Sequence, residues 1–93
     1  METTKYVISI IKMPDSINGY EEHYYFLDVA LDKDGHLIAR STGNIWDAMK
    51  FNYGLNIDET KRILSLIEFI KTCYIPKKKY KISIIPITLN YEM

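Results

Sequence analysis

Apolar and polar residues alternate most clearly between His23 and Thr42, on either side of a polar segment that ends in Asp34-Gly35. Alternation with a period of two is typical of half-buried β-strands, and an Asp-Gly turn between two such runs is a strong hairpin signal. The pattern therefore predicts an antiparallel hairpin across residues 23–42.

Two registers of this hairpin are open. If all four residues 32–35 form the loop, Leu31 pairs with His36 and Leu27 with Arg40, which mixes apolar and charged groups on one face. If Gly35 instead takes the left-handed position of a G1 bulge after a type I turn, Asp32 pairs with His36. The second register is preferred because it collects apolar residues on one face. These residues are Leu27, Val29, Leu31, Leu37 and Ala39.

The same register separates the two histidines of the chain. Asp28 lies opposite Arg40, and Asp32 lies opposite His36 beside the turn. His23 lies at the far end of the hairpin, roughly 25 Å away at about 3.3 Å per residue. The two histidines are therefore not expected to share a metal ion, and His36 is expected to be a solvated partner of Asp32.

Two further segments predict strands near the ends of the chain. Apolar residues occupy both odd-numbered and even-numbered positions of Tyr6–Met13, as in a central strand that is buried on both faces. The run Tyr80–Leu89 reads as the last strand. Because Pro86 lacks the N–H that a central strand needs, this strand is expected at a sheet edge or with a bulge.

Two helices are predicted between the hairpin and the last strand. The first covers Ile45–Tyr53, between capping side chains at 41–44 and the glycine at 54. The second is capped by Asn56, with Glu59 three residues later as in a capping box, and it ends before Pro76. Its apolar face consists of Ile63, Leu66, Ile67, Ile70, Cys73 and Tyr74. The order β-β-β-α-α-β predicts one α+β domain over residues 1–93, with a four-stranded, mainly antiparallel sheet and two helices packed on one face.

Composition narrows the class of protein. A chain of 93 residues with 47% hydrophobic and 13% aromatic content is typical of one globular core. Its 12 basic and 12 acidic residues cancel, so no net field attracts nucleic acid or an anionic membrane. The single cysteine excludes a disulfide framework and a multi-cysteine zinc site. With neither a signal-peptide pattern nor a run of about 20 apolar residues, the chain is expected to be soluble and cytoplasmic.

The hairpin turn has a partial likeness to a calcium-binding loop. Asp32, Asp34 and Gly35 match the third, fifth and sixth positions of that loop. The first ligand position falls on Ala30, however, and the position of the bidentate glutamate falls on Ser41. Two necessary oxygen donors are missing, so no calcium ion is expected, and no other metal or cofactor is predicted.

Catalytic residues are few. The sequence contains neither a glycine-rich phosphate loop nor a nucleophile elbow. Cys73 lies on the apolar face of the second predicted helix, near its C-terminus, where the helix dipole disfavours a negative charge and packing is the favoured role. An enzyme is not expected, and a small hydrolase built around His23 or His36 is a distant alternative.

Eight tyrosines are many for a chain of this length. Tyrosine is frequent on recognition surfaces because it offers a large contact area at low entropic cost. Tyr20, Glu22, Tyr24 and Tyr25 gather at the mouth of the hairpin and form the candidate protein-binding patch. A/T-rich codon usage, which also favours Ile and Lys, is the competing explanation.

Lys77, Lys78, Lys79 and Lys81 form, with Tyr80, a candidate nucleic-acid-binding cluster. Lysines contact phosphates and a tyrosine ring can stack on a base. Lysines at a helix end and before an edge strand also balance the helix dipole and block edge-to-edge association. Because the net charge is zero, this second role is favoured.

The sequence therefore favours a non-catalytic module that binds another protein, with a nucleic-acid-binding module as the alternative. A small, neutral chain with an A/T-rich codon profile is typical of two kinds of inhibitor that occlude the surface of a protein target. One is the anti-defence protein of a phage or mobile element, and the other is the bacterial immunity protein. A monomer and a homodimer formed by edge-strand pairing are both open.

Overall fold

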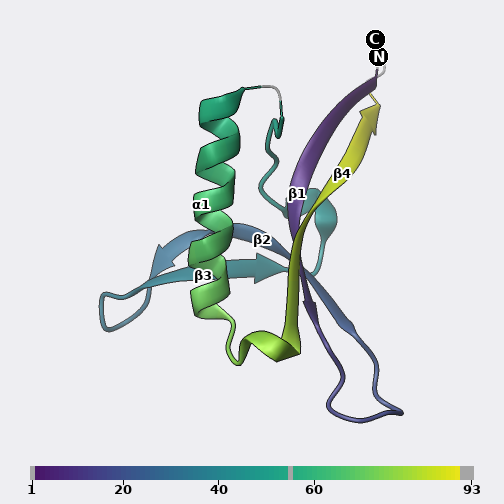
Figure 1. The fold of residues 1–93 in the computed structure, drawn as a ribbon, viewed down its shortest axis with the longest axis vertical. Coiled ribbons are helices and arrows are strands. Elements are labelled where there is room, and N and C mark those ends of the chain that lie inside the picture. Colours follow the sequence, from purple (N-terminus) through teal and green to yellow (C-terminus); the bar gives the residue numbers. More distant parts are fainter. Residues whose placement is uncertain (1, 55, 91–93) are drawn as a thin grey trace.

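The computed structural model describes residues 2–54 and 56–90. They form an antiparallel four-stranded sheet in the order β3-β2-β1-β4, and one α-helix packs against one face of it (Figure 1). The elements are β1 (Glu2–Lys12), β2 (Glu22–Leu31), β3 (Leu37–Thr42), α1 (Ile57–Cys73) and β4 (Tyr80–Asn90). The predicted α+β class is confirmed, and the order β-β-β-α-β has one helix fewer than expected.

β1 is an inner strand, as its two-sided apolar pattern predicted. It pairs with β2 on one side and with β4 on the other. Val7, Ile8 and Ile10 are completely buried. The strand begins at Glu2 rather than Tyr6, because the residues before Tyr6 pair with the end of β4. A strand covered on both faces and both edges anchors the whole sheet.

β4 is an edge strand, as Pro86 predicted. Pro86 lies opposite Tyr6 in β1, and Tyr6 exchanges both of its backbone hydrogen bonds with Phe51 on its other side, at 2.9 and 2.8 Å. Tyr6 and Pro86 are therefore a non-hydrogen-bonded pair, and the nitrogen of Pro86 points to the free edge. Its missing hydrogen removes no bond from the ladder.

The β2–β3 hairpin adopts the second of the two predicted registers. The Asp32 N–H donates to the His36 carbonyl at 2.8 Å, and Asp28 lies opposite Arg40. Gly35 has a φ of 82°, the left-handed conformation that the G1 bulge requires and that glycine adopts without strain. Local turn chemistry therefore determines how the two strands pair.

A second bulge, between Phe26 and Asp28, changes which residues of β2 face α1, from even-numbered before the bulge to odd-numbered after it. The extra residue, Leu27, shifts the alternation of side chains by one position. Phe26 consequently enters the hydrophobic core and Leu27 does not. The expectation that Leu27 shares a face with Val29 and Ala39 is wrong for this reason.

The helix predicted at Ile45–Tyr53 is also wrong. Only Ile45–Asp47 turn helically, as a 3-10 turn in which the side chain of Asn44 accepts a hydrogen bond from the Trp46 N–H. Ala48, which follows this turn, has an extended backbone, and Phe51 forms a β-bridge with Tyr6. Asn44 therefore caps a helical turn as predicted, but this turn does not continue into a helix.

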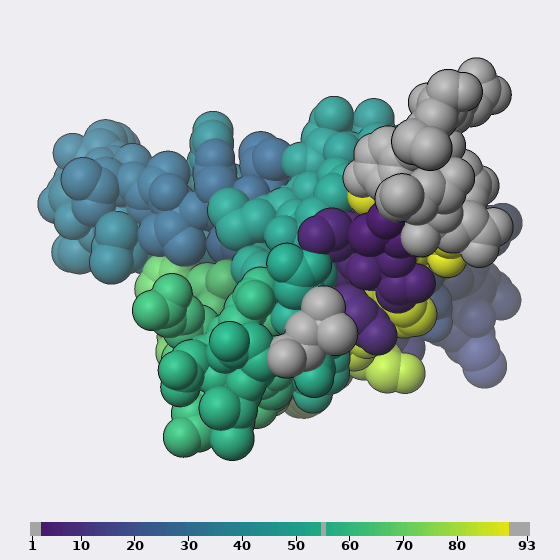
Figure 2. Space-filling model, turned by 90° about the horizontal axis from the view of Figure 1, so that it is seen from above, coloured from purple at the N-terminus to yellow at the C-terminus, as the bar shows by residue number. Residues whose placement is uncertain are grey.

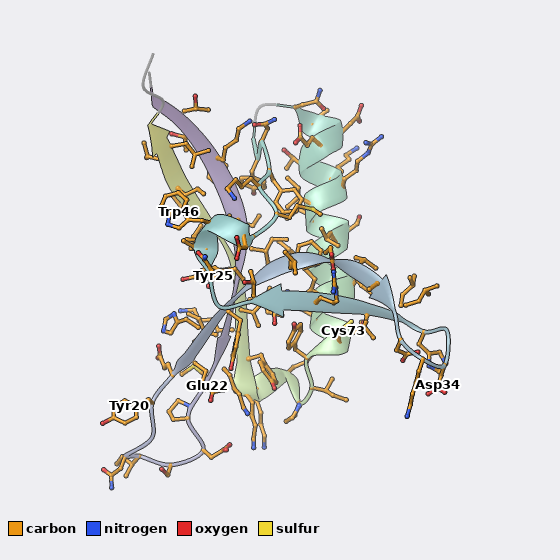
Figure 3. The ribbon with its side chains drawn as sticks, turned by 180° about the vertical axis from the view of Figure 1, so that it is seen from behind. Tyr20, Glu22, Tyr25, Asp34, Trp46 and Cys73 are labelled. Atoms are coloured by element: carbon orange, nitrogen blue, oxygen red, sulfur yellow. The ribbon has the colours of Figure 1, made fainter. Side chains whose placement is uncertain are left out.

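The sheet supplies the hydrogen bonds that replace this helix. The Met49 N–H donates to the Phe26 carbonyl at 3.0 Å, and Phe51 exchanges two bonds with Tyr6. Ladder bonds of this kind satisfy the backbone as fully as a helix does. The 3-10 turn, which carries Trp46, lies on the face of the sheet opposite α1 (Figure 3). The expectation of two helices on one face is thus corrected to one helix.

α1 begins at its predicted cap and buries its predicted face. Asn56 Oδ1 accepts hydrogen bonds from the N–H groups of Asp58 and Glu59, at 2.8 and 3.2 Å. The Glu59 carboxylate accepts from the Asn52 N–H instead of returning to Asn56, so the capping box forms only in half. The core contains Ile63, Ile67 and Ile70 of α1 with Ile8, Ile10, Phe26 and Ala39 of the sheet.

Candidate binding surfaces

The structure divides the predicted tyrosine patch between two faces of the sheet. Glu22 accepts a hydrogen bond from the Tyr24 hydroxyl at 3.3 Å, and Tyr24 packs against the core on the side of α1. Tyr25 follows Tyr24 in an extended strand and therefore points to the opposite face, and Tyr20 lies in the preceding loop (Figure 3). The four residues therefore do not form one surface.

The lysine cluster is divided in the same way. Lys79 Nζ lies 2.8 Å from Asp15 Oδ1 in the β1–β2 loop. This hydrogen bond and the opposite charges raise the pKa of Lys79 and lower the pKa of Asp15. Lys81 and Tyr80 are successive strand residues and point to opposite faces. Lys77 and Lys78 are exposed, and neither forms an ion pair within the described part of the chain.

Lys77 and Tyr80 line an open pocket between the end of α1 and the start of β4. Its volume is about 300 Å³, and its other lining residues are Glu68, Lys71, Tyr74 and Ile82. The rings of Tyr74 and Tyr80 meet edge to face, with their centroids 5.3 Å apart. Within the pocket, Lys71 Nζ is 3.3 Å from Glu68 Oε1. Two lysines against one glutamate leave the pocket with positive charge.

Tyr74 also connects α1 to the edge of β3. Its hydroxyl donates a hydrogen bond to the Ala39 carbonyl at 3.2 Å. We expect Tyr74→Phe to lower the free energy of unfolding by about 1 kcal/mol, the usual contribution of such a bond. Tyr80→Phe is the matched control, because its hydroxyl donates no hydrogen bond to the residues placed by the structure. Urea titration of both variants measures the difference, and equal losses would contradict the role given to the Tyr74 hydroxyl.

Three side chains that could bind a metal ion, those of Asp32, Asp34 and His36, meet at the hairpin turn. Their nitrogen and oxygen atoms lie within 4.8 Å of one another. The turn itself explains this closeness. Asp32 Oδ1 accepts hydrogen bonds from the backbone N–H groups of Asp34 and His36, at 2.8 and 2.9 Å. The other oxygen of Asp32 lies 3.6 Å from His36 Nδ1. The predicted pairing of His36 with Asp32 is confirmed, and the carboxylate holds the turn together.

The structure also places the remaining candidates for catalysis, which are His23, His36 and Cys73. His23 Nε2 lies 3.3 Å from a Glu21 carboxylate oxygen, so each of the two exposed histidines lies beside a different carboxylate. Cys73 is half-buried and packs against the core, as the apolar face of its helix predicted. This arrangement gives the hydrolase alternative no support.

Beyond α1 the hairpin projects as an arm, residues 28–40 (Figure 2). Val29, Leu31 and Leu37 lie on the face that meets α1 at Ala39, yet Leu31 is 66% exposed and Leu37 is 59% exposed. We call these three residues the apolar arm surface. Ile38 is exposed on the reverse face. The arm therefore carries large apolar side chains on both faces.

Sequence reasoning missed this surface because it placed these residues on one face of the hairpin and expected two helices over one face of the sheet. A helix with its side chains is about 10–12 Å wide, whereas a strand of the length of β2 extends about 33 Å. One helix that crosses the hairpin covers it only near Ala39. The length of the hairpin relative to the width of one helix could have predicted this exposure, but a second helix was expected to cover the sheet as well.

An ion pair holds the base of the arm. Arg40 Nε donates to Asp28 Oδ1 at 2.6 Å, and a second guanidinium nitrogen bonds the other carboxylate oxygen. These hydrogen bonds lower the pKa of Asp28 and raise the pKa of Arg40. Two parallel bonds fix the relative position of the two strands where the arm leaves the sheet.

Comparison with known proteins found no protein-family model, no curated protein and no solved structure that matches this chain. Within residues 2–54 and 56–90, no helix has both the length and the apolar content needed to cross a lipid bilayer. The candidate surfaces are therefore judged on their own geometry.

Proposed function

We propose that this protein is a non-catalytic module that binds another protein through the apolar arm surface. The observation that carries the proposal is the exposure of Leu31 and Leu37 on an arm that projects beyond the helix. Isolated exposed apolar residues are common on soluble proteins, whereas a group of them on one projecting element indicates an interaction site.

Covering this surface would supply useful binding energy. Full burial of a leucine side chain contributes about 1.5–3 kcal/mol, and roughly two thirds of each arm leucine is available for burial. Leu31 and Leu37 together then account for about 2–4 kcal/mol, or roughly a 30- to 700-fold change in affinity. A protein partner suits this surface better than nucleic acid, because the contact is apolar.

The proposed mode of action is occlusion of a partner surface by the inserted arm. This mode is compatible with a small inhibitor, either an anti-defence protein of a phage or mobile element or an immunity-type protein. The half-buried thiol of Cys73 suits a reducing compartment, so we place the proposed encounter in the cytoplasm.

Affinity capture from lysate of the source organism or its host tests this function. Tagged wild-type protein and the double variant Leu31→Ser, Leu37→Ser are compared, with and without nuclease in the wash. We expect a stoichiometric protein partner that survives nuclease. In titrations with the purified partner, the double variant is expected to bind roughly 30- to 700-fold more weakly.

Ile17→Ser is the control, because Ile17 is 98% exposed in a loop outside the arm. It should leave the affinity unchanged. Equal affinity of wild-type protein and the arm variant would contradict the proposal. Loss of affinity in Tyr20→Ala or Tyr25→Ala, with the arm variant unaffected, would locate the binding site at the tyrosines instead. Release of every partner by nuclease would favour the lysine cluster.

A further inference from the structure

The outer edge of β4 offers unpaired backbone groups. Tyr6 and Pro86 are a non-hydrogen-bonded pair, so the even-numbered residues of β4 direct their N–H and C=O groups away from β1. Ile82 and Ile84 are two of these residues. In the part of the chain that the structure describes, no strand lies on that side of β4. Pro86 ends the stretch, because it has no N–H to donate.

The two edges of the sheet differ. At the β3 edge, the outward carbonyl of Ala39 accepts the hydrogen bond from Tyr74. At the β4 edge, Ile82 also lines the pocket that contains Tyr74, Lys71 and Lys77. An open edge beside a helix is the geometry in which an extended peptide adds a strand and places alternate side chains in a neighbouring groove. The figures agree with this arrangement, because the end of α1 lies beside the start of β4 (Figure 1).

Charge indicates the chemistry of the occupant. The pocket contains two lysines and one glutamate, and that glutamate already faces Lys71. Lys77 has no such partner among residues 2–54 and 56–90, and Lys78 beside it is exposed. The chain as a whole is neutral, so this end of the sheet is locally positive. An acidic side chain would complement it.

We propose that the free edge of β4 binds an extended acidic peptide segment of a partner protein as a fifth strand, with one acidic side chain against Lys77. The peptide backbone pairs with Ile82 and Ile84, and its side chains on the α1 side contact the pocket. Pro86 limits the pairing to a short segment. This site is separate from the apolar arm surface and stands without it.

The test uses a labelled hexapeptide of alternating valine and glutamate with blocked ends. We expect it to bind, and to slow hydrogen exchange at the amides of Ile82 and Ile84. Lys77→Ala should weaken binding about tenfold, as loss of one charge-assisted contact does. A peptide with lysine in place of glutamate should not bind.

A proline at position 84 tests strand addition directly. Ile84→Pro removes an N–H group that points to the free edge, as Pro86 does two residues later. Ile84→Ala is the control, because it also removes most of the isoleucine side chain but keeps the N–H. We expect only the proline variant to lose the peptide. The arm variant Leu31→Ser, Leu37→Ser should bind the peptide as tightly as the wild-type protein, so this proposal and the arm proposal fail separately.

Four results would overturn the proposal. The first is no binding of the acidic peptide up to about 1 mM. The second is equal binding by Ile84→Pro and Ile84→Ala. The third is a dimer, seen by sedimentation, that Ile84→Pro dissociates, because the occupant of the edge would then be a second copy of this chain. The fourth is tighter binding of a thymidine oligonucleotide than of the acidic peptide.

Discussion

Phe26→Ala is expected to lower the free energy of unfolding by about 3–5 kcal/mol. Phe26 is completely buried, and its ring stacks on Phe51 with the centroids 6.4 Å apart. Truncation would leave a cavity at the point where the hairpin meets β1 and α1, and packed neighbours relax only in part. Small domains have a total stability of about 5–15 kcal/mol, so the loss is a large share of it.

Urea denaturation followed by circular dichroism measures this loss. Tyr20→Ala is the matched control, because it also truncates an aromatic ring but at a position that is 90% exposed. We expect its effect to stay within about 0.5 kcal/mol. A loss of similar size in the two variants would contradict the placement of Phe26 in the core. It would restore Leu27 as the residue that faces inward.

Ile70→Ala is the second large effect, with an expected loss of about 2–5 kcal/mol. Ile70 is completely buried on the underside of α1 and belongs to the same core cluster as Ile8 and Phe26. The loss should appear as a lower urea midpoint. The dependence of the unfolding free energy on urea concentration should stay the same, because the surface area exposed on unfolding hardly changes.

The same helix supplies the control for this prediction. Leu64→Ala deletes an aliphatic side chain that is 47% exposed, so it should cost less than half as much as Ile70→Ala. Equal costs for the two variants would mean that α1 is rotated about its axis relative to the sheet described above.

The two proposed contacts differ in chemistry and in position. The apolar arm surface leaves the sheet at the β2–β3 hairpin, whereas the β4 edge lies at the opposite side of the strand order. One uses side chains that α1 leaves uncovered, and the other uses backbone groups beside a positive pocket. A partner that engages both would present an apolar surface together with an extended acidic segment.

Features that depend on a few neighbouring residues were predictable. The turn at residues 32–35 left two hairpin registers, and the one with a bulge at Gly35 was preferred because it collects apolar residues on one face. Asn56 caps α1 because its side chain reaches N–H groups only two and three residues away. Pro86 predicted a sheet edge or a bulge through its own missing hydrogen, and β4 is an edge strand. In each of these cases the deciding atoms are close together in the chain.

Features that depend on distant partners were not predictable. The segment after Asn44 carries a capping signal and helical spacing, yet Phe51 pairs with Tyr6 across a long separation in sequence. The bulge at Leu27 similarly adjusts β2 to two different partner strands. Propensity and periodicity contain no information about such partners, so tertiary hydrogen bonding overrode both.

The candidate sites follow the same division. Tyr24 and Tyr25 are adjacent in the sequence, but strand geometry sends them to opposite faces. Lys79 is part of a lysine run, but Asp15 is its partner in the folded chain. The exposure of the apolar arm surface was not predicted, because the sequence shows that Leu31 and Leu37 share a face but not how far a helix covers that face.

The amino-acid sequence by itself therefore determined the α+β class, the inner position of β1, the edge position of β4, the hairpin register and the buried face of α1. All of these follow from side-chain periodicity, turn and cap chemistry, or the covalent structure of proline. Only the tertiary structure decided that one helix covers the sheet, that the arm is left exposed and that Lys77 lines a pocket beside a free strand edge. These outcomes depend on the relative placement of elements that are distant in the chain, which local interactions do not encode.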